Sequence, residues 1–230
     1  TAFAKHTVTG PGATAFLDGL TTNRLPRAGR VALTYALTEA GTVRSEYTIL
    51  REGANAYYLV SAGAWAAYDG DDLRKAAEDF MAGGGAWVAV KDVTTQWGVF
   101  AVAGPRARDL LRGLVRDADP ATALANARFP WLAARDIELG MCPVKALRVA
   151  YTGELGWELH HPIEMQNYLF DLIAAAGEAQ GLAYVGARAQ NWLRQEKSYR
   201  AFGTELGRDA TPLEAGLDRF VDQAKDFRGK

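Results

Sequence analysis

The sequence predicts an α+β fold built from mostly antiparallel sheets with packed helices. Residues 31–50 hold two alternating apolar segments joined by a short turn, which is the pattern of a β-hairpin. A strand followed by a helix that a Gly-Pro pair opens occurs twice, at Val8–Leu20 and at Trp97–Leu114. This repetition indicates a pseudo-symmetric core, and the apolar spacing of residues 165–176 adds a longer amphipathic helix.

In the first half of the chain, alternation and turn residues predict strands at Lys5–Thr9, Val31–Leu37, Thr42–Leu50, Ala56–Ser61 and Ala86–Val90. Gly10-Pro11-Gly12 opens a short helix, and Ala64–Met81 predicts a longer one that Gly70 weakens. Thr21-Thr22-Asn23 is interpreted as a capped turn. The triple glycine at 83–85 lacks the Gly-Lys-Ser/Thr of a phosphate-binding loop and reads as a linker.

The register of the hairpin decides where Glu46 points. If Leu37 pairs with Thr42, then Tyr35 faces Arg44, and Tyr35 and Glu46 become diagonal neighbours on one face. A slip of one residue would move Glu46 to the opposite face. Without further information, Glu46 would be read as a surface carboxylate paired with Arg44 or Arg51.

The second half predicts a buried strand at Trp97–Ala103 and further helices near Leu110, at residues 165–176 and at Ala187–Lys197. Phe129-Pro130-Trp131 is expected to pack in the core. His160 and His161 are adjacent on a strand, so they point to opposite faces, and we expect no metal site because no third ligand accompanies them.

The composition favours an enzyme domain over a nucleic-acid or membrane protein. The chain has 230 residues, 49% of them hydrophobic, and a net charge of −1 with interspersed signs, so neither nucleic acid nor an anionic membrane is expected as a partner. No apolar run approaches the roughly 20 residues of a membrane span. The single cysteine, Cys142, is expected to be a small buried residue in a reducing compartment, either the cytoplasm or, in a eukaryote, the mitochondrial matrix.

Residues 148–159 contain the most informative stretch, Arg-Val-Ala-Tyr-Thr-Gly-Glu-Leu-Gly-Trp-Glu-Leu. Gly153 and Gly156 interrupt a strand, aromatic residues flank them, and Glu158 follows. A carboxylate among aromatic rings can accept two parallel hydrogen bonds from the edge of a flat, nitrogen-rich ligand. The alternative is an ordinary hairpin with a solvated Glu154 and a core Trp157.

This stretch, together with Leu193–Gly203 and the Thr-Pro-Leu-Glu-Ala-Gly-Leu run at 211–217, resembles the folate-dependent aminomethyltransferase family. The family includes the glycine-cleavage T-protein and the tetrahydrofolate-binding part of dimethylglycine and sarcosine dehydrogenases. The Glu-Lys-Ser-Tyr-Arg run at 196–200 resembles the dehydrogenase branch more than the T-protein. The resemblance extends from about Lys5 to Lys230.

The resemblance implies a central folate cavity and assigns residues to it. Tyr151 and Glu158 would hold the pterin with Tyr35 against the rings, and Arg194 would meet the carboxylate tail, although Gln190 replaces a second arginine of T-protein-like chains. Glu46 would be the catalytic carboxylate, at a position where the T-protein usually has aspartate.

The implied reaction transfers an aminomethyl or iminium unit to tetrahydrofolate and gives 5,10-methylenetetrahydrofolate and an amine. The expected partners are a small amine donor and, for a T-protein-like chain, a lipoyl carrier protein. FAD is expected only if the parent protein has an additional domain. A folate-dependent methyltransferase or demethylase with another methyl donor, and a non-catalytic folate-binding module, remain alternatives.

The same resemblance predicts three parts of the chain. Residues 1–18 and 96–203 would form a discontinuous, ferredoxin-like α+β subdomain, and residues 19–95 an inserted antiparallel-sheet subdomain. Residues 204–230 would lead into a third, β-rich domain that is absent from this chain.

Overall fold

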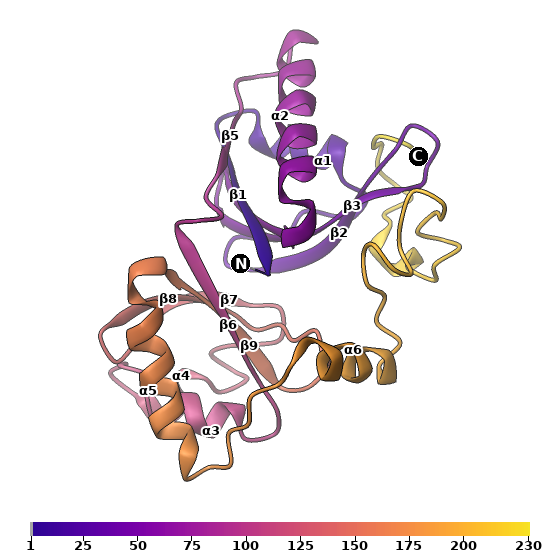
Figure 1. Cartoon of the computed structure of the whole chain (residues 1–230). Helices are drawn as coiled ribbons and strands as arrows, with labels where there is room; N and C mark the ends of the chain where they lie inside the picture. The colour runs from indigo at the N-terminus through magenta and orange to yellow at the C-terminus, as the bar shows by residue number, and fades with distance from the viewer. Residues whose placement is uncertain (1) are drawn as a thin grey trace. The chain divides into compact units, whose positions relative to one another are not determined.

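The structure, a computed structural model that describes residues 2–230, divides into two compact units (Figure 1). The first unit contains the residues up to Thr94 together with Arg200–Lys230, and the second unit contains Thr95–Tyr199. Helices and antiparallel sheets occur in both units, as the predicted α+β class requires.

The first unit is built on a five-stranded sheet of order β2-β3-β4-β1-β5. Its strands are β1 (Phe3–Thr9), β2 (Val31–Leu37), β3 (Val43–Gly53), β4 (Ala56–Ala62) and β5 (Ala89–Asp92). The helices of this unit are α1 (Ala13–Leu20), α2 (Ala66–Ala82) and the short turns η1 (Gly63–Trp65) and η3 (Asp218–Phe220).

One face of this sheet packs against α1 and α2. Apolar residues of α1 (Phe16, Leu17) and of β3 (Tyr47, Ile49) meet in one buried cluster. Helix α2 is continuous, so Gly70 does not interrupt it. Gly70 instead allows the helix to lie close to β1, since a Cβ at this position would lie 3.0 Å from His6 Nε2.

The hairpin register differs from the predicted one by two residues at Tyr35 and by one residue at Leu37. Tyr35 pairs directly with Glu46, and Leu37 with Val43, because a β-bulge shifts the register between Ala36 and Leu37. A shift of two residues keeps each side chain on its face, so Tyr35 and Glu46 share a face as predicted, but as direct partners and not as diagonal neighbours.

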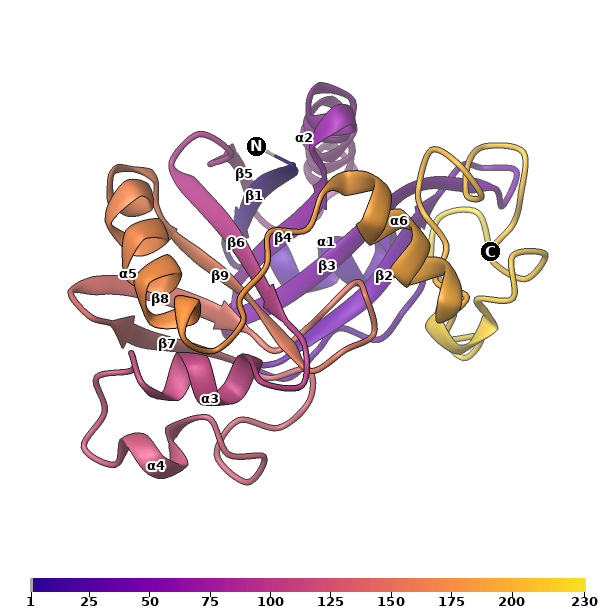
Figure 2. The ribbon, with the colours of Figure 1, turned by 60° about the horizontal axis from the view of Figure 1, so that its bottom comes forward.

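The C-terminal segment, residues 200–230, packs around the end of the hairpin formed by β2 and β3 (Figures 1 and 2). Tyr35, Leu37 and Val43 form a buried cluster there with Leu206 and Leu217. Half-buried aromatic side chains pack against this cluster, namely Phe202, Phe220 and Phe227.

The second unit is built on a four-stranded antiparallel sheet of order β6-β9-β8-β7. Its strands are β6 (Trp97–Ala103), β7 (Ala134–Leu139), β8 (Cys142–Leu147) and β9 (Gly156–Pro162). The helices are α3 (Ala107–Arg112), α4 (Pro120–Ala123), η2 (Ile163–Met165), α5 (Gln166–Glu178) and α6 (Ala187–Glu196).

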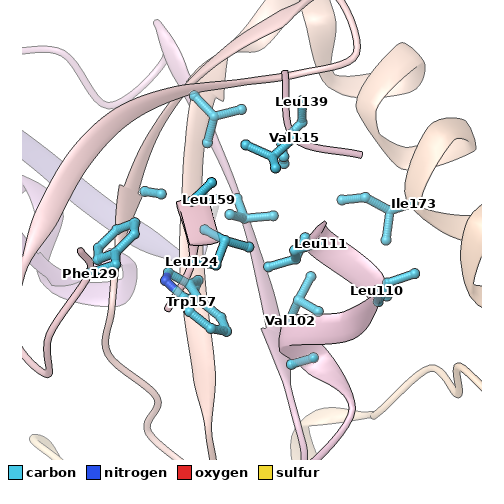
Figure 3. Close-up of a cluster of buried hydrophobic side chains, with 14 of the residues drawn as sticks. Val102, Leu110, Leu111, Val115, Leu124, Phe129, Leu139, Trp157, Leu159 and Ile173 are labelled. Atoms are coloured by element: carbon cyan, nitrogen blue, oxygen red, sulfur yellow. The ribbon is translucent and has the colours of Figure 1, made fainter. Parts of the chain in front are cut away.

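One face of the second sheet packs against α3 and α5. Figure 3 shows Leu110 and Leu111 of α3 and Ile173 of α5 near Val102 and Leu159 of the strands. Residues next to these on the strands point to the other face because side chains alternate. Contrary to expectation, β6 is a half-buried edge strand, since only one of its sides is paired.

The division into units differs from the predicted one. β1 pairs with β4 and β5, so the residues around it belong to the first sheet and not to the subdomain of residues 96–203. The residues after 204 pack on the first sheet, while the third domain that they were expected to introduce stays a prediction. Within residues 2–230, no helix combines the length and the apolar character needed to cross a membrane.

Candidate functional site

Glu46 lies in the first half of β3, directly beside Tyr35 of β2. Although the residue keeps part of its surface accessible, burial raises the pKa of Glu46 to about 7, and a hydrogen bond from the Tyr35 hydroxyl acts in the opposite direction. Tyr35 is only 1% exposed. The carboxyl group therefore changes its charge close to neutral pH, which suits a proton acceptor.

The neighbours of Glu46 on β3 point toward α2, where they meet a buried polar network. The Ser45 hydroxyl donates to Asp69 Oδ1 at 2.7 Å, and burial raises the pKa of the Asp69 carboxyl. One turn further along α2, Asp72 forms ion pairs with Arg44 Nε at 2.7 Å and with Arg228 Nη2 at 2.9 Å. These bonds tie the hairpin, α2 and the C-terminal segment together.

In the second unit, residues 151–155 form a tight turn before β9. Gly153 has φ +70°, and a Cβ there would lie 2.5 Å from Lys197 Cγ. Lys197 Nζ is 3.6 Å from Glu154 Oε1, and the Glu154 side chain is 45% exposed. The Lys197 stem thus lies over Gly153, which brings together two of the sequence stretches that carry the family resemblance.

Glu158 projects from β9 on the sheet face opposite to α3 and α5, because its neighbours Trp157 and Leu159 belong to the helix-covered core. Its side chain is 12% exposed, and Oε2 lies 3.3 Å from His160 Nε2. His160 is thus a hydrogen-bonding neighbour of this carboxylate through Oε2.

Trp157 is a core residue, as the alternative interpretation of the loop expected. It is 1% exposed, and its ring meets Phe129 edge to face at 6.1 Å (Figure 3). The guanidinium groups of Arg148 and Arg108 lie 5.7 and 5.8 Å from the Trp157 ring centre. Phe129 packs in the core as predicted, while Trp131 is 48% exposed.

The remaining predicted binding residues also lie in the second unit. Tyr151 is half-buried in the turn before β9. Arg194 on α6 is 2% exposed, donating through Nε and Nη2 to Asn191 Oδ1 at 2.9 and 2.7 Å and through Nη1 to the Tyr199 carbonyl at 2.8 Å. These bonds stabilise the end of α6, so they give Arg194 a structural role beside its predicted contact with the folate tail.

The structure thus pairs Tyr35 with Glu46 in the first unit and places Tyr151, Glu158 and Arg194 in the second. The contact between Glu158 and His160 was missed at the level of sequence, where His160 was considered only as a metal ligand. The sequence signal for this contact is the spacing of two residues on a strand, which puts both side chains on one face. Among residues 2–230, no group of three His, Cys, Asp or Glu side chains is arranged to hold a metal ion.

Comparison with known proteins places these features in a family. Residues 1–225 match the GCVT N-terminal domain. The chain is 36% identical over 230 residues to human mitochondrial dimethylglycine dehydrogenase, covering 99% of this chain and 26% of that protein. It is 30% identical over 212 residues to an aminomethyltransferase of Chlorobium luteolum, covering 91% of this chain and 55% of that protein.

The fold matches a solved structure as well. The glycine cleavage system aminomethyltransferase T from Bartonella henselae superposes with a TM-score of 0.82 at 23% identity, over 99% of this chain and 58% of that one. The chain therefore belongs to the GCVT N-terminal domain family and has an aminomethyltransferase-like fold. It spans about a quarter of the length of the dimethylglycine dehydrogenase that it matches.

Proposed function

We propose that this chain carries out tetrahydrofolate-dependent one-carbon transfer, with an aminomethyl or iminium donor and with 5,10-methylenetetrahydrofolate and an amine as products. The observation that carries the proposal is the direct pairing of Tyr35 with Glu46, where burial raises the pKa of the carboxyl group to about 7. Membership of the GCVT N-terminal domain family supports the substrate class. Tetrahydrofolate, when bound, would supply the nitrogen nucleophile that accepts the one-carbon unit.

Glu46 is the catalytic carboxylate of this proposal. Because burial raises the pKa of Glu46 to about 7, its carboxyl group can gain or lose a proton near neutral pH. The ionised form can accept a proton from the attacking amine and stabilise positive charge that develops nearby. The Tyr35 hydroxyl donates to the same carboxylate and so favours the ionised form.

Glu158 and Tyr151 are the proposed pterin-binding residues. The chemistry of Glu158 fits this role, because Oε1 can accept a hydrogen bond while Oε2 is held by His160 at 3.3 Å. A carboxylate with low exposure forms stronger hydrogen bonds than a solvated one. Tyr151 would add ring contact. Arg194 would complete the set at the folate tail, although its guanidinium also donates to Asn191 and Tyr199.

The proposal also covers the type of parent protein, its further cofactor and partner, and its compartment. Identity is higher to the dimethylglycine dehydrogenase than to the aminomethyltransferase, which favours a dehydrogenase-like parent with a small N-methylated amine as donor. FAD would then belong to a further domain. A lipoyl carrier protein would be the partner only of a T-protein-like parent. The mitochondrial relative favours the mitochondrial matrix if the source is a eukaryote.

A paired measurement tests the proposal: the tetrahydrofolate dissociation constant by calorimetry and the transfer rate in a single turnover with bound folate. We expect stoichiometric binding by the wild-type chain. Glu46→Gln should keep folate affinity and slow transfer by roughly 100-fold or more.

Glu154→Gln is the matched control, since Glu154 lies in the turn before β9 with an exposed side chain. It should change neither quantity. A folded wild-type chain that releases no heat with tetrahydrofolate would refute folate binding. Weakened binding with an unchanged bound-state rate in Glu46→Gln would refute the catalytic role of Glu46.

A further inference from the structure

The ring of Tyr35 is held by side chains outside the hairpin that carries it. Phe220, in the turn η3 of the C-terminal segment, meets the Tyr35 ring edge to face, with 6.2 Å between ring centres and 70° between planes. Edge-to-face pairs of this kind have a defined geometry, so they restrict the rotation of both rings. Phe220 therefore fixes one side of the tyrosine whose hydroxyl donates to Glu46.

Thr22 holds both partners of this ring pair through hydrogen bonds. Its Oγ1 donates to the Phe220 carbonyl at 2.9 Å and accepts from the Tyr35 backbone N–H at 3.3 Å. Its backbone N–H donates to the Tyr35 carbonyl at 2.9 Å, and its carbonyl accepts from the Asp222 N–H at 2.9 Å. Thr22 thus joins β2 to the C-terminal segment at the residue pair that borders Glu46.

The C-terminal segment is itself anchored on both sides of this contact. Arg24 Nε lies 2.6 Å from Asp222 Oδ2, and Lys225 Nζ lies 2.9 Å from Asp18 Oδ1. Arg228 reaches the buried Asp72 at 2.9 Å. A segment held at several points can fix the Phe220 ring, whereas a segment that moved freely could not.

We propose that Phe220 and Thr22 are positioning residues, which together hold Tyr35 so that its hydroxyl donates to the Glu46 carboxylate. The inference rests on the proposed function for its consequence in catalysis, but the contact itself can be measured without folate. Removing a hydrogen bond to the charged form of an acid raises the pKa of that acid. Loss of positioning should therefore appear at Glu46 although neither Phe220 nor Thr22 titrates.

The experiment is a carboxyl 13C NMR titration of the folate-free chain labelled in glutamate, with the Glu46 signal assigned by its absence in Glu46→Gln. We expect Tyr35→Phe to raise the Glu46 pKa by roughly one unit. Phe220→Leu and Thr22→Val should raise it in the same direction by a smaller amount. Phe227→Leu is the control, since Phe227 packs on the same buried cluster as Phe220 but lies outside the turn η3.

Conservative variants separate positioning from general loss of stability. Phe220→Tyr keeps an aromatic edge, and Thr22→Ser keeps the hydroxyl, so both should retain the wild-type Glu46 pKa even if they lower the melting temperature. An unchanged Glu46 pKa in Phe220→Leu and Thr22→Val would overturn the proposal. So would an equal increase in Phe227→Leu or in the two conservative variants.

The transfer assay keeps this inference distinct from the proposed function. A raised Glu46 pKa in Phe220→Leu supports positioning even if Glu46→Gln transfers at the wild-type rate, an outcome that would refute only the catalytic role. If Glu46→Gln is inactive and Phe220→Leu keeps the wild-type pKa, positioning is refuted and the catalytic role stands. If the catalytic role of Glu46 and the positioning by Phe220 both hold, the acid limb of the pH profile of the transfer rate should move to higher pH in Phe220→Leu.

Discussion

Replacing Glu46 by glutamine should stabilise the chain, and only toward neutral and alkaline pH. In the folded chain burial raises the pKa of Glu46 from its ordinary value of 4.5 to about 7. Between these two values the folded state binds more protons than the unfolded state, so the free energy of unfolding falls as the pH rises through this window. The destabilisation is complete above pH 7 and absent below pH 4.5.

The size of the effect follows from the gap between the two pKa values, which corresponds to at most about 3 kcal/mol. Because Glu46 keeps part of its surface accessible, solvent screening reduces this figure, and we expect about 1–3 kcal/mol at pH 8. Glutamine has nearly the same volume, and its amide oxygen can still accept from the Tyr35 hydroxyl. Glu46→Gln should thus gain stability while it loses transfer activity.

Urea unfolding of the wild-type chain and of Glu46→Gln at pH 5 and pH 8 tests this reasoning, with the exposed Glu154→Gln as the control for loss of one negative charge. The stability advantage of Glu46→Gln should grow between the two pH values, and that of the control should not. An advantage that is the same at both pH values, or a loss of stability at pH 8, would show that Glu46 is not held in a desolvating site.

Three further predictions concern the other parts of the site. Glu158→Gln should weaken tetrahydrofolate binding about 10- to 150-fold in calorimetry, since it replaces a charged acceptor with an amide; unchanged affinity would contradict the binding role. Gly153→Ala should lower the free energy of unfolding by roughly 1–2 kcal/mol in denaturant titrations, because its φ is +70° and the Lys197 stem lies against it; a neutral effect would refute the strain. Arg228→Met should lower the free energy of unfolding by about 1–3 kcal/mol in the same measurement, since it removes one of the ion partners of the buried Asp72. An unchanged free energy of unfolding would show that Arg44 alone satisfies Asp72.

The sequence predicted the hairpin and the shared face of Tyr35 and Glu46, but not their direct pairing. Alternation of apolar residues defines which face a side chain takes, and a shift of two residues leaves that pattern unchanged. The bulge between Ala36 and Leu37 has no comparable signal, because no glycine marks it. Periodicity therefore determined the face, and only the structure determined the partner.

Elements without a strong period were the hardest to predict from sequence. β7 (Ala134–Leu139) was not expected, since the adjacent charged residues Arg135 and Asp136 break the alternation over a short stretch that follows an irregular loop. β5 was expected three residues too early, because apolar residues precede it in the chain. By contrast, β2 and β6 lie at the predicted residues, where regular alternation or a continuous apolar run ends at a clear turn signal.

The role of the C-terminal segment shows why the properties of Glu46 could not be read from its own strand. On β3, Ser45 and Tyr47 point toward α2, while Glu46 points to the face that residues 200–227 cover beside Tyr35. An isolated hairpin would leave that face in water, and Glu46 would be an ordinary solvated carboxylate. Tyr35, the hydrogen-bond partner of this acid, packs against a segment more than 150 residues away in the chain, which is joined to the hairpin through Thr22. Local sequence can nominate such a carboxylate, but only the tertiary contact gives it a pKa that is useful for proton transfer.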